Sequence, residues 1–112
     1  MKIAVPVVNG KLSPHFGHCE AFAMVEADAE TRTIASQELV EAPPHQPGLL
    51  PPWLAEQGAE TIIAGGMGSR AQALFQQQNI QVVVGAPADT PEAVVTAYLN
   101  GTLQTGGNLC DH

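Results

Sequence analysis

A proline-rich break divides this chain into two parts with different patterns of apolar residues. Residues 42–52 contain five prolines, and a segment with so few amide hydrogens cannot pair as a strand. Before the break, the stretches 2–8, 21–27 and 31–40 carry the apolar and β-branched residues of extended chain. After it, short apolar runs alternate with segments of helical spacing. The sequence therefore predicts three consecutive strands, followed by alternating helices and strands.

The turns of the first part differ in how clearly they can be assigned. The connection at residues 28–30 is short enough for a hairpin between the second and third strands. Asn9 and Gly10 are also compatible with a two-residue hairpin turn. The residues that follow them hold Pro14 and a group of histidines, however, so we expect a longer loop that reaches Cys19.

The second part alternates between helix and strand signals. We expect helices at residues 51–58, 68–79 and 91–100, and strands at 61–64 and 81–84. Thr90 is a typical helix N-cap in front of Pro91, and Gly58 suits a left-handed helix end. Both strands are largely apolar, which is typical of strands buried on both faces of a sheet.

The predicted element order is therefore β-β-β-α-β-α-β-α. With right-handed crossovers it gives an α/β fold of the ribonuclease H-like type, a mixed five-stranded sheet flanked by helices. A chain of 112 residues is long enough for one domain with one core, so we expect a single domain over residues 1–112. Residues 101–112 have no periodicity and are expected to form a mobile tail unless something holds them.

Charge and hydropathy exclude several classes of protein. The net charge is −7, and the four basic residues, Lys2, Lys11, Arg32 and Arg70, form no stripe, which argues against nucleic-acid binding. No apolar run is long enough to cross a bilayer, and the N-terminal residues lack the anatomy of a signal peptide. We therefore expect a cytoplasmic protein, a monomer or weak homo-oligomer, whose thiols stay reduced.

Soft metal ligands are concentrated in two short clusters. His15, His18 and Cys19 form the first, and Cys110 and His112 form the second. Thiolate and neutral imidazole suit zinc, copper(I) and iron–sulfur species, so the clusters predict one composite metal site. In the alternative interpretation both cysteines are small buried hydrophobes and the histidines are polar loop residues. A Cys19–Cys110 disulfide is a further alternative, and His45 is expected to be an exposed loop residue.

A glycine-rich turn, Gly65-Gly66-Met67-Gly68, follows a predicted buried strand and opens a helix. Ligands of open α/β sheets bind beyond the carboxyl ends of the strands, where amide groups at a helix start favour an anion. The turn lacks the lysine of a phosphate-binding P-loop, and its glycines also fit a purely structural tight turn. Arg70 is either a partner of an anionic ligand or a surface residue. We expect the loop at residues 9–19 to lie at the same sheet edge, with Phe16 packed inward.

Catalytic interpretations find little support in the sequence. A nuclease of the ribonuclease H type needs clustered carboxylates for two metal ions, and residues 2–8 contain none. A nucleophile made of Cys19 with His15 or His18 would lack a recognisable orienting residue. We therefore expect a protein that is not an enzyme.

Three segments of the chain resemble the dinitrogenase iron–molybdenum cofactor biosynthesis family, of the NifX/NafY type and of the domain fused to the C-terminus of NifB. These segments are residues 1–22, 64–71 and 97–112. The resemblance implies a ribonuclease H-like fold without nuclease activity. It also implies that an iron–sulfur or iron–molybdenum type cluster, or its precursor, is bound as cargo, exchanged with donor or acceptor proteins. The implied cofactor site is lined by His15, Phe16, Gly17, Gly65, Gly66, Met67, Gly68 and Arg70.

Residues and resemblance together favour a cytosolic metallocluster carrier with His15, His18, Cys19, Cys110 and His112 as ligands. The net charge of −7 opposes an anionic cluster at long range, so attraction must be local. The alternative is a regulatory or interaction domain that binds no metal. It would bind a small anion, or a partner protein through its acidic strand face, since residues 20–41 hold six of the eleven acidic residues.

Overall fold

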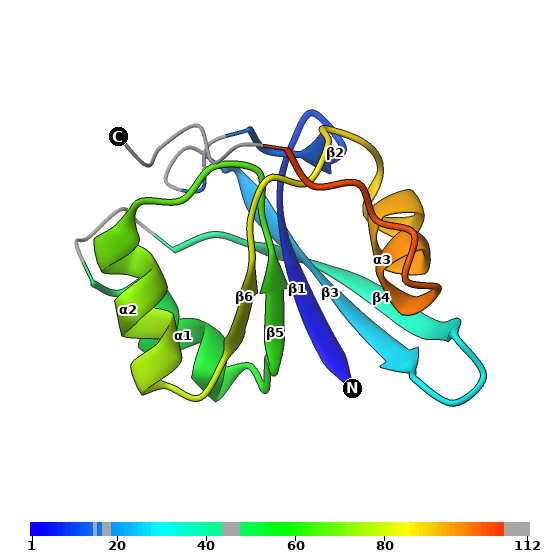
Figure 1. Cartoon of the computed structure of the whole chain (residues 1–112). Helices are drawn as coiled ribbons and strands as arrows, with labels where there is room; N and C mark the ends of the chain where they lie inside the picture. The colour runs from blue at the N-terminus through cyan, green and yellow to red at the C-terminus, as the bar shows by residue number, and fades with distance from the viewer. Residues whose placement is uncertain (15, 17–18, 44–47, 107–112) are drawn as a thin grey trace.

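A mixed β-sheet with helices on both faces forms the body of the protein. The computed structural model describes residues 1–14, 16, 19–43 and 48–106. The strands are β1 (Lys2–Val8), β2 (Lys11–Leu12), β3 (Ala21–Asp28), β4 (Thr33–Glu41), β5 (Thr61–Ile63) and β6 (Gln81–Val83), and the helices are α1 (Leu50–Glu56), α2 (Ser69–Gln77) and α3 (Pro91–Leu99). The strand order is β4-β3-β1-β5-β6, with β2 paired to β1. Figure 1 shows α1 and α2 on one side of the sheet and α3 on the other.

The predicted α/β class, with strands first and then alternating helices and strands, is confirmed. β3 pairs antiparallel with both β1 and β4, whereas β5 pairs parallel with β1 and with β6. Parallel neighbours place their carboxyl ends at one edge of the sheet, which lies at the top in Figure 1. Within the described part of the chain, no helix has the length and apolarity needed to cross a membrane.

The sheet has six strands where five were predicted, because Asn9 and Gly10 do form a hairpin turn. Val7 pairs with Leu12 and Val8 with Lys11 on either side of the turn. Asn9 has φ 54° and Gly10 has φ 79°, and two positive φ angles are what a type I′ turn requires. The expectation of one long loop over residues 9–19 was therefore wrong, and the loop that carries the first ligand cluster begins only after Leu12.

Side chains alternate between two cores, one on each face of the sheet. The core under α3 contains Ile3, Val5, Val25, Ile63, Val94 and Val95, and the core under α1 and α2 contains Ala4, Phe22, Leu54, Ile62, Met67 and Phe75. β1 and β5 contribute to both, since neighbouring residues of a strand point to opposite faces. The prediction that residues 61–64 form a strand buried on both faces is confirmed.

β6 differs from its prediction as a fully buried strand. It forms an edge of the sheet, where Gln81 is exposed and Val82 and Val83 are half-buried.

The boundaries of the helices agree better with those predicted from the sequence. Thr90 caps α3 by accepting a hydrogen bond from the amide of Ala93 at 3.3 Å, as the sequence predicted.

Candidate glycine-rich site at the carboxyl edge of the sheet

The loop after β2 and the turn after β5 are joined by two backbone hydrogen bonds. The amide of Gly66 donates to the carbonyl oxygen of Pro14 at 2.7 Å, and the amide of Phe16 donates to that of Gly66 at 2.9 Å. The expectation that the histidine-containing loop lies at the same sheet edge as the glycine turn is therefore confirmed. The amide of Gly66 is used in this pairing, which leaves the amides at the start of α2 as the turn's donors for an anion.

Close backbone approach explains why Gly65 is glycine. A Cβ atom at this position would lie 3.0 Å from the Cα and carbonyl oxygen of Pro14 and from the carbonyl oxygen of Ser13. These are backbone atoms, which cannot move away as a flexible side chain can. Gly65 therefore has the structural role that the sequence left open. Because it has no Cβ, the loop can lie against the turn.

Replacing Gly65 with alanine is expected to lower the free energy of unfolding by about 1–3 kcal/mol, the usual cost of overpacking a well-packed position. Urea denaturation would measure the change. Gly68→Ala is the matched control, because Gly68 has φ −66° and no atom lies within 4 Å of its added Cβ. Equal stability losses in the two variants would contradict a specific role for the approach to Pro14.

The tail after α3 is tied to the same edge. The amide of Gly85, just after β6, donates to the carbonyl oxygen of Gly65 at 2.6 Å, and the amide of Gly106 donates to that of Gly85 at 2.7 Å. Leu103 packs against the core under α3, so residues 102–106 form a strap across the top of the sheet, the orange-red segment in Figure 1. The tail was expected to be mobile unless something holds it, and for residues 102–106 these contacts with the sheet do so. Residues 107–112 lie outside the described residues.

Gly85 and Gly106 belong to the candidate site through these hydrogen bonds, and the sequence analysis missed both. Gly85 has φ +83°, and a Cβ there would collide with the backbone of Gly106. The available signal was position: Gly85 follows the predicted strand 81–84 directly, as Gly65 follows the predicted strand 61–64. The signal could not show that the partner of Gly85 would come from the C-terminal segment.

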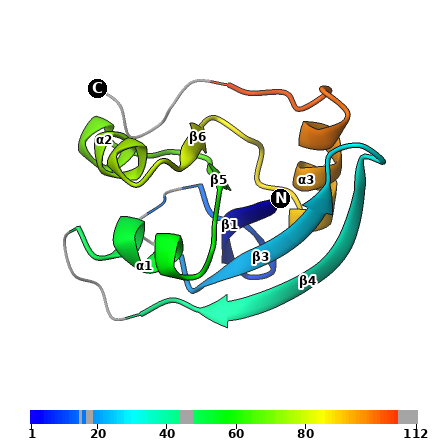
Figure 2. The same cartoon turned by 90° about the horizontal axis from the view of Figure 1, so that it is seen from below.

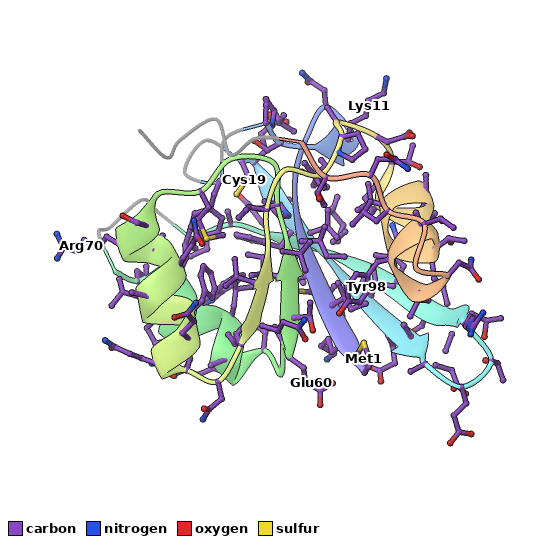
Figure 3. All side chains as sticks on the ribbon, in the orientation of Figure 1. Met1, Lys11, Cys19, Glu60, Arg70 and Tyr98 are labelled. Carbon is purple, nitrogen blue, oxygen red and sulfur yellow. The ribbon has the colours of Figure 1, made fainter. Side chains whose placement is uncertain are left out.

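Cys19 lies half-buried at this end of the molecule and packs against the core under α1 and α2 (Figure 3). Burial raises the pKa of its thiol from 9.0 to about 11, and a backbone hydrogen bond at Cys19 opposes the shift in part. The thiol is therefore protonated at neutral pH. A metal that binds the sulfur must displace this proton, so metal binding at Cys19 would release a proton.

Cys19 is expected to react about a hundredfold more slowly with thiol reagents at neutral pH than an ordinary cysteine, because its pKa of about 11 lowers the thiolate fraction. The Cys110→Ser variant leaves Cys19 as the only thiol, and its reaction with a chromogenic disulfide can be followed as a function of pH. The same variant unfolded in urea is the control. A rate that levels off near pH 9 in the folded protein would contradict the shift.

The same shift predicts how stability depends on pH. A thiol whose pKa is raised on folding binds more protons in the folded than in the unfolded state between pH 9 and about 11. Its contribution to stability is therefore complete below pH 9 and is lost as the pH rises toward about 11.

Phe16 and Met67 face the interior rather than the surface of the site. The Phe16 ring is 8% exposed and meets Phe75 edge to face, with ring centroids 5.4 Å apart. The prediction that Phe16 packs inward is confirmed. Met67 is 1% exposed in the same core, so only its backbone faces the site, and that carbonyl oxygen already accepts a bond from the Gln72 amide at 3.0 Å.

The basic residues of the site region are exposed. Arg70 extends outward from the start of α2, away from the sheet, in Figure 3. Its guanidinium therefore does not lie over the glycine turn in this conformation. Lys11, to which the sequence analysis gave no role, lies on β2 at the upper edge of the same view. No side chain caps the N-terminus of α2 within the described part of the chain.

Four of the five predicted metal ligands, His15, His18, Cys110 and His112, lie outside the described residues, as do Gly17 and His45. Among residues 1–14, 16, 19–43 and 48–106, no three histidine, cysteine or acidic side chains are grouped closely enough to hold a metal ion. The structure brings the described residues Pro14, Phe16 and Gly106 to the same edge of the sheet, and convergence of the ligands themselves stays a prediction.

Comparisons with known proteins cover nearly the whole chain. The model of the family described as "Dinitrogenase iron-molybdenum cofactor" matches residues 1–101. An uncharacterized protein of Methanocaldococcus jannaschii, MJ0580, is 35% identical over 109 residues, which are 93% of this chain and 90% of that protein. The crystal structure of PH0822 has a TM-score of 0.86 and 29% identity, covering 94% of each chain. The apo form of the orange protein from Desulfovibrio gigas has a TM-score of 0.72 and 26% identity, covering 96% of this chain and 93% of that one.

The family match and the ligand clusters overlap only in part. Residues 1–101 include the loop with His15 and Cys19 and the whole glycine turn. The strap and the second cluster, Cys110 and His112, lie beyond the matched range. The first cluster and the turn are therefore the part of the site that the family relationship covers.

Proposed function

The chain belongs to the dinitrogenase iron–molybdenum cofactor family, and on that premise we propose that it binds an iron–sulfur or iron–molybdenum type cluster, or its precursor, as cargo. It would pass this cargo between donor and acceptor proteins and would not act as a catalyst. The observation that carries the proposal is the series of backbone hydrogen bonds that links Gly106, Gly85, Gly65 and the loop around Phe16.

These hydrogen bonds support a shared site for the two ligand clusters. His15 adjoins Pro14 and Phe16, which pair with the glycine turn. Cys110 follows Gly106 by four residues, and four residues of extended chain span at most about 14 Å. A cluster at the carboxyl edge of the sheet could therefore be ligated from both sides, although the ligands are far apart in the sequence.

The chemistry of the donors suits such a cargo. Cys19 and Cys110 would supply thiolates, and His15, His18 and His112 would supply imidazoles. The uncapped amides at the start of α2 can donate to an anionic sulfide edge, because the first amides of a helix have no intrahelical partner. This local attraction would offset the repulsion of a net charge of −7. In the bound state Arg70 and Lys11 would have to move toward the turn to contribute.

A carrier must also release its cargo, and the position of the two ligand clusters on separate segments of the chain supports such release. One ligand cluster is on a loop fixed by two hydrogen bonds, and the other follows a strap whose last described contact is the bond from Gly106 to Gly85. Withdrawal of the tail would open one side of the site while the loop stays in place. The cargo could then be handed over without unfolding of the sheet.

Anaerobic reconstitution with ferrous iron and sulfide tests the proposal. We expect visible absorption from a bound cluster, and iron and sulfide in constant proportion to protein. The Cys19→Ser/Cys110→Ser double variant should lose both, because it removes the only two thiolates. His45→Ala is the matched control, since it removes the one histidine outside the clusters and should retain the colour.

Two results would contradict the proposal. One is a wild-type protein that stays colourless and metal-free through the reconstitution. The other is a double variant that binds as much iron and sulfide as the wild type. Either result would favour the alternative function, a regulatory or interaction domain that binds no metal.

A further inference from the structure

β4 is an exposed edge strand, and no described residue pairs with its outer side. It is nine residues long and pairs only with β3 among the described residues. Figure 2 shows it on the outside of the molecule, with no element beyond it. Seven of its nine residues are exposed, and only Ile34 and Val40 are half-buried. A strand with an open row of amides and carbonyls is a template for pairing with another chain.

The register identifies the backbone groups that face outward. In an antiparallel pair, residues alternate between directing their amide and carbonyl toward the neighbour and away from it. The amide of Ala42 donates to the carbonyl oxygen of Glu20 at 3.2 Å, which continues the β3–β4 register by one pair. Glu38 and Val40 therefore face β3. Gln37, Leu39 and Glu41 direct their amides and carbonyls outward.

An apolar side chain stands at the centre of this outward-facing row. Leu39 is 68% exposed, the most exposed large hydrophobic residue in the described part of the chain. Its partner on β3 is Ala23, which is fully buried, so Leu39 lies at the margin of the core under α3. Glu41 is on the same face and Glu38 is on the other. The edge thus presents an apolar anchor flanked by carboxylates.

The charge around β4 indicates what kind of strand could pair with it. Residues 20–41 hold six of the eleven acidic residues and one of the four basic ones, Arg32. A second copy of this chain would bring the same acidic surface against itself, and like charges across a strand pair are destabilising. A basic segment would be attracted by the same surface.

We propose that the outer edge of β4 is a docking site for an extended, basic segment of a partner protein, which adds to the sheet as a further strand. Backbone hydrogen bonds to Gln37, Leu39 and Glu41 would give affinity. An apolar side chain beside Leu39 and basic side chains beside Glu38 and Glu41 would give specificity. The docking residues include none of the proposed cargo ligands, so the docking site does not depend on the cargo.

Binding of a synthetic peptide tests this docking site. The probe is a fluorescently labelled peptide of about eight residues, a typical strand length, in which lysines surround one central valine, and its binding is measured by anisotropy. We expect Leu39→Pro to weaken binding by about tenfold, because proline removes an outward amide and breaks no bond to β3. Amide hydrogen exchange at Gln37, Leu39 and Glu41 should slow when the peptide binds the wild type.

A pair of charge reversals tests the docking site independently if the proline variant does not fold. Glu38→Lys/Glu41→Lys should weaken peptide binding by tenfold or more. Glu56→Lys/Glu92→Lys is the matched control, because it makes the same change in net charge at exposed positions on α1 and α3, and it should weaken binding much less. An analogous peptide of glutamate and valine should not bind the wild type.

Three outcomes would overturn the docking site. In the first, the basic peptide fails to bind, or binds without slowing exchange at the β4 amides. In the second, the two pairs of charge reversals weaken binding equally, which would show attraction to net charge alone. In the third, sedimentation shows a dimer that Leu39→Pro abolishes, so that a second copy of this chain occupies the edge.

Discussion

The Gly85→Ala variant is expected to lose about 2–5 kcal/mol of stability and to release the strap, residues 102–106, from the sheet. A non-glycine residue in the left-handed region costs about 1–2 kcal/mol, and Gly85 has φ +83°. An overpacked contact costs about 1–3 kcal/mol more, and the added Cβ would collide with the backbone of Gly106. Urea denaturation measures the stability. Hydrogen exchange of the Gly106 amide, which donates to Gly85 at 2.7 Å, reports on the strap.

Gly101→Ala separates the two causes. Gly101 also has a positive φ, +72°, but no atom lies within 4 Å of its added Cβ. This variant should show only the backbone cost, about 1–2 kcal/mol, and should leave the Gly106 amide protected. If both variants lost equal stability and both kept that amide protected, the contact between Gly85 and Gly106 would not be what holds the strap.

The same pair of variants connects the strap to the proposed cargo. If Cys110 ligates a cluster, Gly85→Ala should retain less iron and sulfide after gel filtration than Gly101→Ala, because the second ligand cluster is no longer held near the glycine turn. Equal retention would show that the strap does not position the C-terminal ligands. It would leave the ligands of the first loop, and the proposal built on them, intact.

Much of the central sheet could be predicted because its signals are local. The apolar runs of β1 and β5, and the Thr90-Pro91 start of α3, each depend on a few neighbouring residues, and each is confirmed. The glycine turn could be recognised as the end of a buried strand. Parallel strand ends share an edge, so this turn also indicated which edge would carry the site.

Features that depend on strand order or on distant segments could not be predicted. The valines of β6 look as apolar as a central strand, but their burial depends on whether another strand follows, and none does among the described residues. At Asn9 and Gly10, a local turn signal competed with Pro14, and the turn signal prevailed because both residues tolerate positive φ. The bond between Gly85 and Gly106 depends on the path of the chain after α3.

The ligand set is the part of the site that the sequence predicts only by residue type. Cysteine and histidine indicate soft-metal chemistry, whereas coordination depends on the conformation of two loops. Arg70 shows the difference clearly. Its position after the glycine turn left two roles open, a partner of an anionic ligand or a surface residue, and in the structure it extends outward (Figure 3). The sequence shows which residue types could act as ligands, but only the fold shows where their side chains point.

Replacing Phe75 with alanine is expected to lower the free energy of unfolding by about 3–5 kcal/mol, the usual cost of removing a buried aromatic ring. Phe75 is fully buried on α2, and its ring supports that of Phe16 at 5.4 Å. The loop that carries the first ligand cluster should therefore loosen as well. Urea denaturation measures the first effect, and hydrogen exchange of the Phe16 amide, which donates to Gly66 at 2.9 Å, measures the second.

Leu54→Ala is the matched control for the effect on the loop. Leu54 is also fully buried in the core under α1 and α2, and its removal should cost about 2–5 kcal/mol. The two variants are compared at urea concentrations that give them equal stability. Only in Phe75→Ala should the amide of Phe16 exchange its hydrogen faster than the amide of Ile62 in β5. Equal exposure of both amides in both variants would mean that the loop opens only with the whole sheet. The loop would then move only with the sheet, and the proposed release would depend on withdrawal of the tail alone.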